Sequence, residues 1–147
     1  MVSKCRILVV DDEPAIRALV AKIVERAGFP VDTARDGAEA IEMLDATSYG
    51  VIVLDLMMPN IDGYGLIRHL KQRGTTPRPA VIVVSAGDSA ALRQLDGAMV
   101  HSILRKPFDI DVLGDLIAAA ASSFETEDAR MQEKRDILPF RRTDDVC

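Results

Sequence analysis

The chain has 147 residues and 48% of them are hydrophobic, which suits one domain with a packed core. Its net charge of -5 gives no general attraction for nucleic acid or for an anionic membrane surface. No apolar stretch approaches the roughly 20 residues that span a bilayer, and the first residues do not resemble a signal peptide, so we expect a cytoplasmic protein without membrane insertion.

Short runs rich in valine and isoleucine alternate along the chain with segments whose apolar residues recur at helical spacing. The runs predict strands over residues 5–10, 30–34, 51–55, 80–85 and 99–104. The segments between and after them predict helices over residues 14–27, 37–47, 63–73, 88–96 and 109–123. This regular alternation predicts a parallel sheet with helices on both of its faces.

The runs differ in ways that predict their places in the sheet. Residues 6–10, 51–55 and 80–84 are apolar without alternation, as strands buried on both faces are. Residues 30–34 alternate and begin with a proline, which favours an edge strand. Cys5, in the first run, is interpreted as a small core residue, because the other cysteine lies at the opposite end of the chain and the pair predicts no disulfide framework.

The composition changes after the last predicted helix. Twelve of residues 124–147 are charged, and no further strand and helix follow. We predict a domain over residues 1–123 and a charged extension over residues 124–147 that is helical at first and then loose. An alternative is that Ile137, Leu138 and Phe140 form a docking contact or a homodimer contact.

Acidic residues follow two of the predicted strands. Asp11 and Asp12 come directly after the first strand, and Asp55 ends the third. Ligands of open α/β sheets bind outside the carboxyl ends of the strands, where the strand order reverses. If the first and third strands are neighbours, the three carboxylates converge and need a positive charge between them. Mg²⁺ fits best, because it commonly binds carboxylates, waters and a substrate phosphate.

The other predicted strands end in residues that suit phosphoryl transfer. Ser85 and Ala86 follow the fourth strand, and Lys106 follows the fifth. An aspartate can act as a nucleophile and form an acyl phosphate. Mg²⁺, Lys106 and the Ser85 hydroxyl can each neutralise one phosphoryl oxygen, and the small Ala86 side chain leaves room for the group.

Each of these residues also has a plain structural interpretation. Asp11 and Asp12 are acids of the kind that favour a helix N-terminus, and Asp55 suits a turn before the next proline. Lys106 can be a surface lysine, and Ser85 can cap the following helix. Their joint placement at the strand ends favours one functional site over four unrelated roles.

Four segments occur in the order and at the spacing of a known family. Together, "ILVVDDEP", "VIVLDLMMPNIDG", "VIVVSA" and "RKPF" resemble the receiver domain of bacterial two-component response regulators, over residues 5 to about 121. The resemblance implies a doubly wound, flavodoxin-like α/β fold with five helices and the strand order 2-1-3-4-5.

The resemblance also assigns roles to the candidate residues. It implies that Asp55 is the phospho-acceptor, that Asp12 binds Mg²⁺ directly and Asp11 through water, and that the backbone carbonyl of Met57 supplies another ligand. The peptide bond before Pro107 is expected to be cis. The residues expected against the phosphoryl group are Ser85, Ala86 and Lys106.

The fifth predicted strand departs from the family pattern. The family usually carries an aromatic residue three positions before the lysine, but this chain has Ile103 there and His101 two positions earlier. The segment over residues 97–106 also looks two residues longer than usual. We expect phosphorylation to change the surface around residues 86–108, with Ile103, His101 and Pro107 as the candidate switch and output residues.

These observations predict a stand-alone receiver rather than an enzyme. We expect a sensor histidine kinase or a phosphotransfer protein to phosphorylate Asp55, and an output protein to be contacted directly, without direct binding of nucleic acid. Because neither Met57 nor Gly87 can orient a water molecule through its side chain, we expect self-dephosphorylation to take minutes or longer.

Two alternatives from other classes stay open. One is a magnesium-dependent phosphohydrolase with an aspartyl nucleophile, against which Met57 counts because such enzymes generally carry a second acid two residues after the nucleophile. The other is an interaction module that no longer uses phosphate, against which the acidic residues and Lys106 count.

Overall fold

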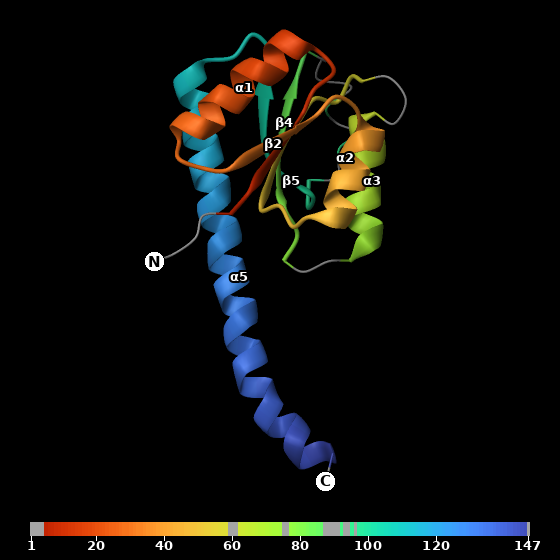
Figure 1. The fold of residues 1–147 in the computed structure, drawn as a ribbon, viewed down its shortest axis with the longest axis vertical. Helices are drawn as coiled ribbons and strands as arrows, with labels where there is room; N and C mark the ends of the chain where they lie inside the picture. The colour runs from red at the N-terminus through yellow and green to blue at the C-terminus, as the bar shows by residue number, and fades with distance from the viewer. Residues whose placement is uncertain are drawn as a thin grey trace.

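The computed structural model of the chain describes residues 5–58, 62–74, 77–86, 92, 95 and 97–146, and it describes side chains up to residue 133. A parallel sheet of five strands forms the centre of the domain (Figure 1). The strands are β1 (Ile7–Val10), β2 (Val31–Ala34), β3 (Val51–Leu54), β4 (Ala80–Ser85) and β5 (Val100–Arg105). Their order across the sheet is β2-β1-β3-β4-β5, which confirms the predicted doubly wound topology.

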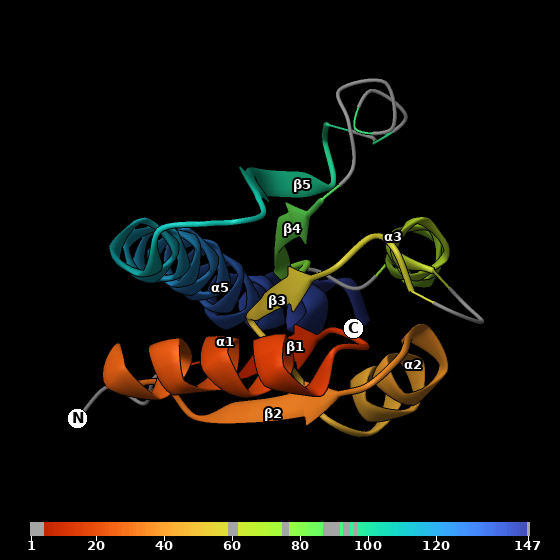
Figure 2. The same ribbon diagram turned by 90° about the horizontal axis from the view of Figure 1, so that it is seen from above.

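Helices cover both faces of the sheet (Figures 1 and 2). Among the described residues they are α1 (Pro14–Arg26), α2 (Gly37–Ala46), α3 (Gly63–Arg73) and α5 (Ile110–Val146). The helices α1 and α5 lie on one face, and α2 and α3 lie on the other. The helix predicted over residues 88–96 lies almost entirely outside the described residues.

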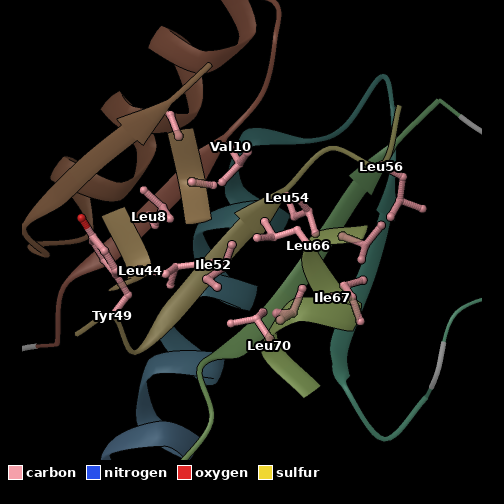
Figure 3. Close-up of a cluster of buried hydrophobic side chains, with 14 of the residues drawn as sticks. Leu8, Val10, Leu44, Tyr49, Ile52, Leu54, Leu56, Leu66, Ile67 and Leu70 are labelled. Carbon is pink, nitrogen blue, oxygen red and sulfur yellow. The ribbon is translucent and has the colours of Figure 1, made fainter. Parts of the chain in front are cut away.

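Two hydrophobic cores fill the space between the sheet and its helices. In β1, Ile7 and Val9 pack toward α1 and α5, whereas Leu8 and Val10 pack toward α2 and α3, because successive side chains of a strand point to opposite faces. Figure 3 shows the second core, where side chains from β1 and β3 meet the Leu66 side chain of α3 and its neighbours. Burial on both faces explains why the central strands are apolar without alternation.

Local signals place the ends of the helices. Asp36 caps α2, since its side chain accepts a hydrogen bond from the backbone N–H of Glu39 over 2.8 Å, and Asp62 caps α3 in the same way. Pro14 occupies the first turn of α1, where its missing N–H costs nothing. Gly74 ends α3 with a φ of 65°, a left-handed conformation that glycine adopts readily.

The edge strand β5 contains an irregularity at His101. Val81 of β4 pairs with Val100, but the next residue of β4 pairs with Ser102, so His101 is an extra residue in the ladder. This bulge absorbs one of the additional residues expected in this segment. Ile103, two residues after His101, has an exposed fraction of 45%, so nearly half of it lies in solvent.

The last helix is longer than the sequence predicted. Its described buried side chains end at Ala121, yet the backbone stays helical to Val146 and extends well beyond the sheet (Figure 1). Residues 118–136 contain neither glycine nor proline and are rich in strong helix formers, which explains the continuation as far as residue 136. The candidate contact residues Ile137, Leu138 and Phe140 lie outside the described side chains.

The first turn of the extension packs against the end of the sheet remote from the strand ends that carry the acids. A Cβ atom on Gly50 would lie 2.7 Å from Cδ2 of Phe124 and 2.6 Å from Cβ of Cys5, so the close approach requires glycine there. The backbone N–H of Cys5 donates a hydrogen bond to Oε2 of Glu125 over 3.4 Å. Burial raises the pKa of the Cys5 thiol to about 11, which agrees with its interpretation as a packing residue.

Candidate functional site

Three carboxylates meet at the carboxyl ends of β1 and β3. These strands are neighbours, with Val10 opposite Leu54, so the next residue of each strand lies at the same edge of the sheet. One carboxylate oxygen from each of Asp11, Asp12 and Asp55 lies within 4.8 Å of the other two. Each of Asp11 and Asp55 is only 4% exposed, whereas Asp12 is exposed. The convergence predicted from strand adjacency is therefore present.

Lys106 supplies the positive charge at this cluster. Its Nζ atom lies 3.2 Å from Oδ2 of Asp11, 3.5 Å from Oδ2 of Asp55 and 3.6 Å from Oε1 of Glu13. Burial lowers the pKa of Lys106, but the neighbouring carboxylates, Asp55 first, outweigh it and raise the pKa above its ordinary value. The lysine is therefore a firmly charged group in contact with two buried acids.

The carboxylate of Asp55 carries an electrostatic cost. Burial is the main reason that its pKa is raised to about 6, and the charges of Asp11 and Asp12 act in the same direction. The backbone N–H of Met57, which donates to Oδ1 of Asp55 over 3.1 Å, and the Lys106 ammonium oppose the shift. A cation bound between the three acids would remove much of this cost.

The end of β4 completes the site. Ser85 is the last residue of β4 and is 1% exposed, and its carbonyl accepts the backbone N–H of Lys106 over 3.1 Å. This bond joins the ends of β4 and β5, so Ser85 and Lys106 lie side by side as the predicted phosphoryl site requires. Ala86 follows in an exposed position. The bond between Lys106 and Pro107 is cis, as the family resemblance implies.

The candidate output residues lie in two different places. Pro107 borders a hollow of about 370 Å³ beside Lys106, which is lined by Glu13, Ile16, Leu19, Lys106, Pro107 and Phe108. Ile103 lies on β5 opposite Val83, two positions before Ser85. His101 is exposed at the bulge, where its Nδ1 atom lies 2.7 Å from Oγ of Ser102. Of the three, only Pro107 lies directly beside the charged cluster.

Two residues in contact with the site were given no role from the sequence. Glu13 approaches Lys106, and Arg17 of α1 donates from Nη1 to the backbone carbonyl of Asp11 over 2.9 Å. A role for Glu13 could have been inferred from its position directly after Asp11 and Asp12. The arginine gave no comparable signal, because its contact depends on how a side chain six residues away folds back over the turn.

The chemistry of the acidic cluster suits a hard cation. All three side chains offer carboxylate oxygen, two of them are held by the ends of rigid strands, and the exposed Asp12 leaves the cluster open toward solvent. Such a donor set fits a divalent ion that keeps several waters better than a metal that needs sulfur or nitrogen ligands.

No described helix is both long and apolar enough to cross a membrane.

Comparison with known protein sequences gives a consistent picture. The family model for the response regulator receiver domain matches residues 7–118. The transcriptional regulatory protein TcrA of Mycobacterium tuberculosis is 41% identical over 115 residues, which are 76% of this chain and 44% of TcrA. The response regulator MprA of the same species is 37% identical over 126 residues, 84% of this chain and 54% of MprA. This chain therefore spans about half the length of these relatives.

The match is not confined to regulators of that kind, because the sensor histidine kinase RcsC of Salmonella typhimurium is 36% identical over 115 residues, 78% of this chain and 12% of RcsC. The solved structure of the response regulator protein TrrA from Thermotoga maritima, in complex with Mg(2+)-BeF, is 29% identical, with a TM-score of 0.70 over 79% of this chain and 98% of TrrA. The chemotaxis protein CheY4 from Vibrio cholerae is 25% identical, with a TM-score of 0.73 over 80% of this chain and 99% of CheY4. The chain belongs to the response regulator receiver domain family of two-component signal transduction.

Proposed function

We propose that Asp55 accepts a phosphoryl group in a magnesium-dependent reaction, and that a sensor histidine kinase or a phosphotransfer protein is the donor. One observation carries this proposal. Asp55 is a buried carboxylate with two further carboxylates within 4.8 Å and the ammonium of Lys106 at 3.5 Å. No packing role requires this concentration of charge, whereas phosphoryl transfer needs a nucleophile, a cation site and a positive group at one place.

The acids are suited to hold the cation. Asp11, Asp12 and Asp55 would hold Mg²⁺ together with the backbone carbonyl of Met57, and the bound ion would neutralise charge on the carboxylates and on the incoming phosphoryl oxygens. The Mg(2+)-BeF complex named for TrrA supports this choice of ion, since that receiver is similar over most of this chain.

The transfer step is a displacement at phosphorus. An oxygen of the Asp55 carboxylate forms a bond to phosphorus while the bond from phosphorus to the donor histidine nitrogen breaks. The electron pair of the broken bond stays on the imidazole, which takes a proton from solvent. Lys106 and the Ser85 hydroxyl stabilise the phosphoryl oxygens, and the small side chain of Ala86 leaves room for the group.

The product changes the charge at the end of β4 and β5. An aspartyl phosphate adds negative charge and acceptor oxygens between Ser85 and Lys106, which are joined by the bond between their main chains. We infer that the surface over residues 86–108 then shifts between two arrangements and is recognised by an output protein through direct contact. Ile103, His101 and Pro107 are the exposed or bordering side chains through which this contact forms.

Labelling with acetyl phosphate tests the proposal. The small donor replaces the kinase, so incorporation measures only the chemistry of this chain. We expect one phosphoryl group per chain in the presence of Mg²⁺, and none after chelation of the metal or in Asp55→Asn. The matched control is Asp115→Asn, because Asp115 is an exposed acid on α5. Labelling that persists in Asp55→Asn, or that is independent of Mg²⁺, contradicts the assignment.

We also propose that the chain is not a turnover enzyme. The residue two positions after the nucleophile is Met57, whose side chain is 61% exposed and offers no acid for a leaving group. A single labelling event followed by slow loss of phosphate is therefore expected. Sustained release of many equivalents of phosphate from a phosphate ester in the same assay would instead support the phosphohydrolase.

A further inference from the structure

Asp11 is restrained through four of its polar groups. Its backbone N–H donates to the carbonyl of Ala34 over 3.2 Å, and its Oδ1 atom accepts the backbone N–H of Glu13 over 2.9 Å. Its Oδ2 atom accepts from Nζ of Lys106 over 3.2 Å, and its backbone carbonyl accepts from Nη1 of Arg17 over 2.9 Å. The position of Asp11 therefore does not depend on a bound metal ion.

Asp12 is held differently. It is exposed, and within the described part of the chain no hydrogen bond or ion pair restrains its side chain. Its carboxylate nevertheless lies within reach of Asp11 and Asp55, which repel it because they carry the same charge. The backbone must therefore aim this side chain toward Asp11 and Asp55.

The contact made by Arg17 acts on that backbone. The carbonyl of Asp11 and the N–H of Asp12 belong to one planar peptide unit, so a hydrogen bond to the carbonyl fixes the orientation of the whole unit. The orientation of the unit sets the direction in which the Asp12 side chain leaves the backbone. The backbone of Arg17 is itself held in the first turn of α1, because its N–H donates to the carbonyl of Glu13 over 2.9 Å.

We propose that Arg17 is a positioning residue, which holds the peptide between Asp11 and Asp12 so that the Asp12 carboxylate faces the cation site. This inference rests on the proposed function, since only a site that binds Mg²⁺ gains from a preset Asp12. Ordering of metal ligands by neighbouring groups is a general source of metal affinity. The guanidinium suits the task because it stays protonated and donates in a fixed plane.

A purely electrostatic role and a positioning role of Arg17 predict opposite changes in Mg²⁺ affinity when the residue is removed. If Arg17 acted only as a positive charge near the acids, it would repel Mg²⁺, and its removal would tighten binding of the ion. If it acts by positioning Asp12, its removal weakens binding although a repelling charge has been lost. The direction of the change in Mg²⁺ affinity therefore separates the two roles.

The experiment is a titration of the full, metal-free chain with Mg²⁺. Binding is measured by calorimetry and by the backbone amide signals of residues 11–13 in NMR spectra. We expect Arg17→Ala to weaken Mg²⁺ binding about 10-fold, and Arg17→Lys, which keeps a donor and the charge, to recover most of it. Arg73→Ala is the matched control, because Nη1 of Arg73 makes the same kind of contact with the carbonyl of Leu44 over 3.1 Å. This control is expected to lower thermal stability and to leave Mg²⁺ affinity unchanged.

The outcomes distinguish the positioning role of Arg17 from the proposed phospho-acceptor function on which it rests. An unchanged or tighter affinity in Arg17→Ala overturns the positioning role and leaves the phospho-acceptor function intact, whereas a wild-type chain that binds no Mg²⁺ overturns both. If Arg17→Ala does not fold, Arg17→Gln replaces it. The positioning role then requires affinity no tighter than that of the wild type, and a purely repulsive role requires tighter binding.

Discussion

The ammonium nitrogen of Lys106 lies 3.5 Å from Oδ2 of Asp55. The same nitrogen also lies 3.2 Å from Oδ2 of Asp11, so one positive charge is shared between two buried acids. Without metal, Lys106 is the main counter-charge of the cluster. If a metal ion and a phosphoryl group bind, we expect Lys106 to turn toward the phosphoryl oxygens.

Replacement of Lys106 by methionine should separate its role as counter-charge to the acids from its role at the phosphoryl oxygens. We expect Lys106→Met to lower the thermal stability of the metal-free chain, because the acids lose their counter-charge, and to tighten Mg²⁺ binding several-fold, because a competing cation is removed. Labelling by acetyl phosphate should become much slower. Calorimetry with Mg²⁺ and labelling rates check these expectations. Lys22→Met, at an exposed position of α1, is the control, and weaker Mg²⁺ binding in Lys106→Met would contradict the shared-charge interpretation.

The raised pKa of Asp55 has a consequence for stability against pH. Because burial raises this pKa from 3.8 to about 6, the folded chain holds the proton more tightly than the unfolded chain does. The resulting stabilisation is complete below about pH 4 and is lost as the pH rises through about 6. In metal-free buffer, the unfolding free energy of the wild type should therefore fall relative to that of Asp55→Asn, by on the order of 2 kcal/mol between about pH 4 and about pH 7.

Denaturant unfolding of both chains across this pH range measures the difference. Asp115→Asn should show no comparable trend, since that acid is exposed on α5. A difference between wild type and Asp55→Asn that stays constant with pH would show that Asp55 titrates alike in the folded and unfolded chains. Added Mg²⁺ should reduce the trend, because the ion stabilises the charged carboxylate.

Gly63 is placed where a side chain would disturb the backbone at Asp55. A Cβ atom there would lie 2.6 Å from Cα of Leu56 and 2.9 Å from the carbonyl oxygen of Asp55, both of them backbone atoms that cannot move aside cheaply. We expect Gly63→Ala to destabilise the chain by about 1–3 kcal/mol and to slow labelling of Asp55. Thermal unfolding and acetyl phosphate labelling are the measurements.

Gly114 is the control position for the same substitution, because a Cβ atom has room there. It lies inside α5, and the nearest atom to its Cβ position is Cγ2 of Ile23 at 3.9 Å, an ordinary contact. Gly114→Ala should stabilise the chain by roughly 0.5–1 kcal/mol through helix propensity alone. Equal effects of the two substitutions would contradict a special role for Gly63.

The phosphorylated state should be long-lived. The Met57 side chain is 61% exposed and apolar, so it cannot hold a water molecule in line with the acyl phosphate. We expect loss of labelled phosphate from the purified chain to take minutes or longer. Met57→Asn, which adds a hydrogen-bonding side chain at this position, should shorten the lifetime. Loss within seconds from the wild type would contradict the expectation.

Much of the architecture could be predicted because the local signals are strong. The apolar runs around Val9, Val53 and Val83 are the central strands, and the periodic segments between them are helices within a residue or two of their predicted ends. The convergence of Asp11 and Asp55 is different in kind, since periodicity does not reveal which strands are neighbours. That step depended on resemblance to a family of known strand order.

Other features follow from contacts that a linear pattern does not encode. The bond from Arg17 to the carbonyl of Asp11 depends on a side chain that folds back over its own helix start. The bulge at His101 is a matter of register between two strands, and the sequence indicated only that the segment was long. The extension over residues 124–147 was predicted to be helical only at first, because its charged composition indicates no apolar face and helix propensity alone argues for order there.

The shape of α5 has a mechanical consequence. With 37 residues it is about 55 Å long, and among the described side chains its contacts with the end of the sheet extend to Phe124 and Glu125, so more than half of the helix projects beyond its packed part. A tilt of about 5° at the end of the packed part would displace the free end of the helix by about 3 Å, given a helical rise of roughly 1.5 Å per residue. A rearrangement at the sheet too small to alter the core would thus be magnified at the far tip of the molecule.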